Sequence, residues 1–125
     1  MSLPSAARPR RGERGAVTAE TMVVLPLLAA VALGLVWLLA LAAAQMRVVD
    51  AAREVARAAA RDDAPTSAIA LGRRVAPDGA QIRVHDHGAT VTADVVAAVR
   101  GPGGLFDFLP EIDVTASAVA AQEAR

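Results

Sequence analysis

The peptide bond between Gly15 and Ala16, together with Glu20, is where residue types and spacing in this sequence predict chemistry. Gly15 ends a short basic segment, and a glycine gives a protease close access to the backbone. Cleavage there would place the α-amine of Ala16 one helical turn from the Glu20 carboxylate. Residues i and i+4 share a helix face, and a carboxylate is favoured near a helix N-terminus, so the two groups can pair. In an assembly, Glu20 could instead pair with the amine of a neighbouring subunit.

The residues that follow predict the element that positions these groups. The segment from Met22 to Ala44 contains no charged or amide side chain, and about 20 apolar residues cross a hydrocarbon layer of about 30 Å as a helix. Pro26 and Gly34 lie inside it; both are tolerated in membrane helices, and we expect them to take part in helix packing. A charge at the bilayer centre costs about 2.5–3.5 kcal/mol, so Glu20 needs a partner or a place at the membrane surface.

Three interpretations of residues 1–15 compete. This segment is basic, and its Pro and Gly residues predict a non-helical cytoplasmic lead-in. A secretory signal peptide would be cut after Ala42–Ala44, leaving Gln45 as the first residue, but signal apolar regions run about 7–15 residues. An uncleaved signal anchor fits the length and assigns no role to Glu20. A prepilin-type leader is short and basic, ends in Gly, and has Glu as the fifth residue after the cut, as here with a cut after Gly15.

The residues from Arg14 to Ala60 resemble the TadE-like family of the tight-adherence (Flp-type) pilus system. The likeness rests on the RG and AE pairs before the apolar segment, on Pro26 in VVLPLL, and on DAAREVARAAA at Asp50–Ala60. The resemblance implies a structural minor pilin or pseudopilin that a prepilin peptidase processes and that acts in pilus assembly or anchoring, and so in adhesion or secretion. It implies the prepilin peptidase, other pilins, the pilus assembly platform and the lipid bilayer as partners.

The helix is expected to continue past the membrane, so that residues 16–61 form a span and a stalk. Apolar residues recur at spacings of three and four: Val48, Ala51, Ala52, Val55, Ala56 and Ala59. This stripe would pack either on the chain's own small domain or against other helices. Arginines flank the apolar segment about equally on both sides, so charge leaves the orientation undecided. The resemblance implies a single-pass protein of the cell membrane or pilus, with a cytoplasmic N-terminus and an extracytoplasmic C-terminal domain.

Residues 62–125 predict a small α+β domain of pilin-like architecture. DDAPTS ends the long helix, and Thr66 or Ser67 would cap a short helix, SAIALGRRVA. AQIRVHD and ATVTADVVAAV predict two strands around a DHG turn, and EIDVTASAVAAQ predicts a third. We expect a three-stranded antiparallel sheet packed on the short helix or the stalk. A domain this small buries only about 60% of its unfolded surface, so it should be weakly stable alone.

The remaining motifs indicate no catalytic, metal or cofactor site. His85 and His87 would share a strand face, but the sequence has no cysteine and no third histidine to complete a metal site. GPGG at Gly101–Gly104 lacks the Lys and Ser/Thr of a phosphate-binding loop. We expect FDFL to pack in the domain core or against a partner. Zero net charge argues against nucleic acid. We therefore expect neither an enzyme nor a small-molecule substrate. The alternative is a membrane-anchored or secreted binding protein of unknown ligand.

Overall fold

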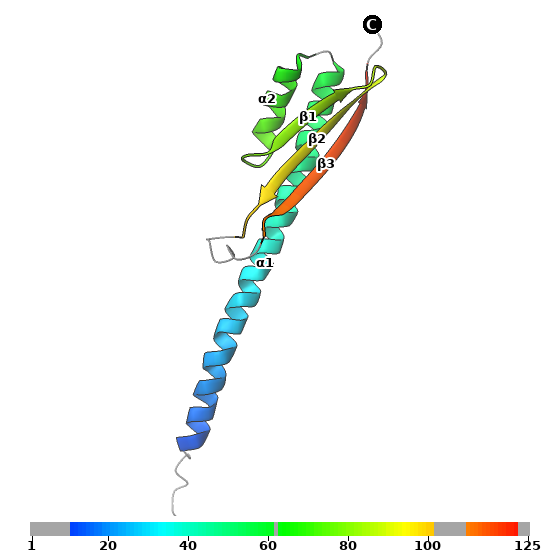
Figure 1. The fold of residues 1–125 in the computed structure, drawn as a ribbon. Coiled ribbons are helices and arrows are strands. Elements are labelled where there is room, and N and C mark those ends of the chain that lie inside the picture. The colour runs from blue at the N-terminus through cyan, green and yellow to red at the C-terminus, as the bar shows by residue number, and fades with distance from the viewer. Residues whose placement is uncertain (1–10, 62, 102–109, 123–125) are drawn as a thin grey trace, which may run out of the picture. The chain divides into compact units, whose positions relative to one another are not determined.

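A computed structural model describes residues 11–61, 63–101 and 110–122. The elements follow in the order α1 (Arg11–Ala60), α2 (Pro65–Val75), β1 (Gln81–Asp86), β2 (Thr90–Val99) and β3 (Ile112–Ala121), as Figure 1 shows. One long helix, one short helix and three strands confirm the predicted α+β class. The chain divides into two compact units between Leu35 and Val36, and each unit is described by itself.

The first unit contains the N-terminal part of α1. Its residues from Gly12 to Ala32 are all exposed, so this part of the helix is not held by packing within the unit. Ala and Leu are its commonest residues, and both favour helix. The helix continues through Pro26, although proline has no N–H to donate to the carbonyl of Met22.

The helix begins earlier than the sequence indicated. We expected residues 1–15 to be non-helical and the helix to begin near Ala16, whereas α1 begins at Arg11. The prediction was wrong because it treated Gly12 and Gly15 as residues that end a helix. Each glycine costs only about 1 kcal/mol relative to alanine. Glu13 offsets part of this cost, because an acidic side chain in the first turn is favoured by the helix dipole.

The second unit contains an antiparallel sheet with the strand order β1-β2-β3. The hairpin between β1 and β2 turns at Asp86-His87-Gly88, as predicted: the His87 N–H donates to the carbonyl of Thr90 at 2.8 Å. Gly88 has φ of 87°, which a residue with a side chain rarely adopts. Its N–H donates to Asp86 Oδ1 at 2.8 Å, so the turn is stabilised by both its backbone and its first side chain.

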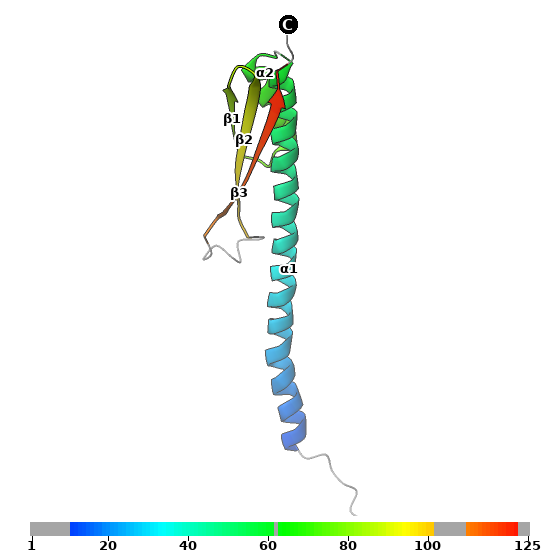
Figure 2. The ribbon, with the colours of Figure 1, turned by 90° about the vertical axis from the view of Figure 1, so that its right-hand side faces the viewer.

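The core of the second unit lies between one face of the sheet and the C-terminal part of α1, which Figure 2 shows beside the strands. Alternate residues of β2 are buried: Val91, Ala93, Val95 and Ala97. The predicted stripe of α1 faces them, with Val48, Ala51, Ala52, Val55 and Ala56 buried and Ala59 partly buried. Of the two interpretations of this stripe, packing on the chain's own domain is therefore confirmed.

The short helix α2 begins with Pro65, and Ala64 is its N-cap residue without a side-chain hydrogen bond. Our prediction that Thr66 or Ser67 caps this helix was wrong. Proline is favoured at the first helical position because its fixed φ suits the helix and its missing N–H has no intrahelical partner there. The FDFL segment and the rest of the GPGG loop after Gly101 lie outside the described residues.

Candidate membrane and assembly segment

The apolar side chains of α1 in the first unit are exposed all around the helix. They are Val17, Met22, Val23, Val24, Leu25, Leu27, Leu28, Val31 and Leu35. Six of these fall at positions 22–25, 27 and 28, which cover every direction around a helix that turns 100° per residue. The most apolar window of α1 has a mean hydropathy of 2.7 and none of it is buried. A helix that is apolar on every side belongs in lipid or among other helices, and α1 is long and apolar enough to cross a membrane.

The predicted processing residues lie at the start of this helix. Gly15, Ala16 and Glu20 are all exposed and helical, so the structure places Ala16 and Glu20 one turn apart on one face, as predicted. Within the described residues, the Glu20 carboxylate makes no hydrogen bond or ion pair. Because Gly15 is in helical backbone, a protease that needs an extended substrate would have to open the helix from its start to beyond Ala16. Helix ends fray at little cost.

Two threonine hydroxyls beside Glu20 are satisfied within the helix. Thr18 Oγ1 donates to the carbonyl of Arg14 and Thr21 Oγ1 to the carbonyl of Val17, both at 2.8 Å. A hydroxyl that enters lipid without a partner is costly, and these bonds remove that cost. Among the described residues from Ala16 to Met22, Glu20 is therefore the polar side chain that has no partner.

Pro26 and Gly34, the predicted packing positions, both lie within α1. A Cβ built on Gly34 would have no atom within 4 Å, so the backbone there is open to a neighbour. Small residues allow helices to approach closely in membranes. The structure contains no second chain, so helix packing at these two residues stays a prediction.

An outward face of α1 in the second unit was not predicted from the sequence. Leu39 and Met46 are 71% and 69% exposed, and with Ala42 and Val49 they follow spacings of three and four. Met46 and Val49 line a shallow hollow of about 220 Å³ with Gln45, Asp50 and Arg53. The spacing could have identified this face in the sequence, but the apolar residues of the membrane segment, which point in every direction, obscured it.

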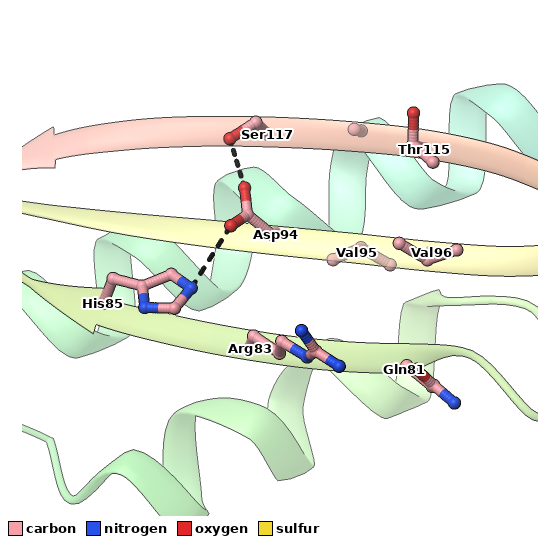
Figure 3. A pocket seen from close by; sticks show the side chains of 9 residues that line it. Gln81, Arg83, His85, Asp94, Val95, Val96, Thr115 and Ser117 are labelled. Atoms are coloured by element: carbon pink, nitrogen blue, oxygen red, sulfur yellow. Dashed lines mark hydrogen bonds and ion pairs between the residues drawn. The ribbon is translucent and has the colours of Figure 1, made fainter.

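A polar cluster lies on the face of the sheet opposite the core (Figure 3). Ser117 Oγ donates to Asp94 Oδ1, and His85 Nε2 lies 3.4 Å from Asp94 Oδ2. The His87 ring stacks on His85 with centroids 6.5 Å apart, so the two histidines do share a face. Since Asp94 separates Ser117 from His85, the histidine is not placed to take the serine proton, as a hydrolase triad requires. Among the described residues, no group of three or more His, Cys, Asp or Glu side chains could hold a metal ion.

Comparisons with known proteins agree with the resemblance seen in the sequence. Residues 15–57 match the family described as TadE-like protein. The chain is also 40% identical over 79 residues to a Mycobacterium tuberculosis protein named apoptosis inhibitor Rv3655c. The matched stretch covers 63% of this chain and 57% of that relative, less than two thirds of its length. No solved structure matches the chain.

Proposed function

With residues 15–57 matching the TadE-like family, we propose that this chain is a minor pilin or pseudopilin of a tight-adherence pilus, acting in its assembly or anchoring. A prepilin peptidase would cut after Gly15. Residues 16–61 would form the membrane helix and stalk, with the span near residues 22–44, and residues 62–125 the extracytoplasmic domain. The partners would be the peptidase, other pilins, the assembly platform and the bilayer. The role is structural, and no enzymatic activity is proposed.

The observation that carries this proposal is the uncovered apolar surface of α1. Between Gly12 and Ala32 every residue is exposed, so the unit itself offers this surface no cover. In a pilin, this surface would be covered in two environments: by the bilayer before assembly, and by the helices of neighbouring subunits afterwards. A single-pass anchor would stay in the bilayer only. A secreted protein from which the helix is removed would not have this surface.

Glu20 supplies the second argument. Cleavage after Gly15 creates a cationic amine on Ala16, four residues from a carboxylate that has no partner among the described residues. Pairing neutralises both charges at the edge of the apolar segment, where an isolated charge is costly. If the amine belongs to an adjacent subunit, the same pair would fix how far one helix is displaced along the next. In that case Glu20 would act in assembly rather than in insertion.

The experiment compares pili on cells that lack the chain and are supplied with it again. The unaltered protein and a Glu13→Ala variant should restore pili, because Glu13 lies in the leader that processing removes. A Glu20→Ala variant should enter the membrane in equal amount and restore few or no pili. Normal pilus numbers in cells that lack the chain would contradict the proposal and favour the alternative, an anchored or secreted binding protein.

A further inference from the structure

The outer face of the sheet carries a recess that the proposed function does not use. Its volume is about 500 Å³, and polar side chains from all three strands line it. They are Gln81, Arg83 and His85 from β1, Asp94 from β2, and Thr115 and Ser117 from β3. Figure 3 shows these side chains on the outer face. The recess is therefore a polar surface built by one small sheet, within the second unit of the chain.

The carboxylate of Asp94 is already engaged on both oxygens. Oδ1 accepts a hydrogen bond from the Ser117 hydroxyl, and Oδ2 lies 3.4 Å from His85 Nε2. Side chains on the two neighbouring strands thus contact this carboxylate from either side, as the two dashed lines in Figure 3 show. Each oxygen of Asp94 thus lies beside a side chain other than that of Arg83.

Arg83 is a cation of this recess that has no ion-pair partner among the described residues. It is the direct cross-strand partner of Asp94 in the register of β1 and β2, and opposite charges in that position normally attract. Even so, within the part of the chain that the structure describes, Arg83 forms no ion pair or side-chain hydrogen bond. The exposed Arg100 makes a useful comparison, because it is paired with Glu111 where β2 ends and β3 begins.

We propose that this recess binds an oxyanion, a carboxylate or phosphate group of an acidic ligand, on the guanidinium of Arg83. A guanidinium presents a planar fork of N–H donors that matches such groups in a bidentate way. The Gln81 amide and the Thr115 hydroxyl line the same recess and supply further donors. The Asp94 carboxylate lies in the same recess and opposes an anion, so the Asp94→Asn variant measures its effect. This site is independent of processing and pilus assembly.

The test is a titration of the full chain in nonionic detergent, followed by NMR of the arginine Nε–H groups and the backbone amides. The probes are acetate and inorganic phosphate, with sodium chloride at matched ionic strength as the reference. Saturable shifts should appear at Arg83 and along the facing residues of β2 and β3. A response to acetate alone identifies a carboxylate site, a response to phosphate alone a phosphate site, and a response to both a general oxyanion site.

Three variants decide the assignment. Arg83→Gln should abolish the shifts, while Arg100→Gln, which removes the same charge from an arginine that already has a partner, should leave them unchanged. Asp94→Asn should leave them equal or larger. If the unaltered chain responds to neither probe, or if only Asp94→Asn responds, Arg83 pairs with Asp94 in solution and the proposal is wrong. Loss of the shifts in Arg100→Gln as well would indicate general charge attraction and would also overturn it.

Discussion

Gly72 of α2 lies so close to Val55 of α1 that a Cβ built on the glycine would come within 2.3 Å of Val55 Cγ2. The same added atom would be 3.1 Å from Ile82 Cδ1 of β1. Three elements of the second unit therefore meet at a residue without a side chain. This contact sets how closely α2 approaches α1, and it is the tightest packing constraint among the described glycines.

The Gly72→Ala variant should lower the free energy of unfolding by about 1–3 kcal/mol, the usual cost of overpacking. Alanine favours helix over glycine by about 1 kcal/mol, so a net loss would show that the clash dominates. Chemical unfolding of the full chain in nonionic detergent, followed by circular dichroism, measures the change. In the Val55→Ala background the same substitution should cost less, because the atom that it meets is gone. Equal costs in both backgrounds would contradict this account of the contact.

Residues 62–125 should be weakly stable without α1. α1 contributes the buried residues Val48, Ala51, Ala52 and Val55 to the core against the sheet. Removing the helix exposes the facing residues of β2, so this fragment should show no cooperative thermal transition above about 65 °C. A fragment from residue 44 onward retains these side chains and should melt at a higher temperature. A sharp transition above that temperature for residues 62–125 would show that the sheet and α2 suffice.

The Gly88→Ala variant should destabilise the second unit by about 1–2 kcal/mol. Gly88 has φ of 87°, and a left-handed conformation costs a residue with a Cβ roughly 1–2 kcal/mol. Ala89→Gly, at the next residue of the same turn, is the control, and it should change stability less. Thermal melting of the full chain measures both. If alanine is tolerated at Gly88, the turn must adopt another conformation in solution.

Gly34→Leu should reduce pilus assembly without reducing membrane insertion. A leucine side chain increases the apolar character of the segment, so insertion should be unaffected. It also fills the open backbone surface at Gly34, which would hold a neighbouring helix away. Ala32→Leu, two residues earlier on a different helix face, is the matched control. The amount of protein in membranes and the number of pili are measured together. Equal pilus numbers for the two variants would show that Gly34 does not contact a neighbouring helix.

The sequence predicted those parts of the fold that follow from local periodicity. Alternation in TVTADVVAAV predicted the strand β2, and three-and-four spacing from Val48 to Ala59 predicted the apolar stripe of α1. Both patterns record which side of one element faces the core. The boundaries were less accurate, because the start of α1 at Arg11 and the proline start of α2 depend on small energies that compete.

The sequence could not predict features that depend on how separate elements meet. Asp94 lies opposite both Arg83 and Ser117 only because of the registers of two strand pairs, and no local pattern shows that its carboxylate turns to Ser117 and His85 instead of Arg83. In the same way, nothing near Gly72 indicates that it faces Val55. The processing residues were predicted from the sequence alone, because the prediction rests on a short spacing along one helix, and their role stays a prediction.

The N-terminal sequence and intact mass of the protein taken from membranes test the central claim most directly. We predict a chain that begins at Ala16, which would show that a peptidase cuts after Gly15 and creates the amine that Glu20 can pair with. A chain that begins at Gln45 would contradict the account, because a signal peptidase would then have removed the apolar helix. A chain that retains its leader would also contradict the proposed processing and would leave a simple membrane anchor.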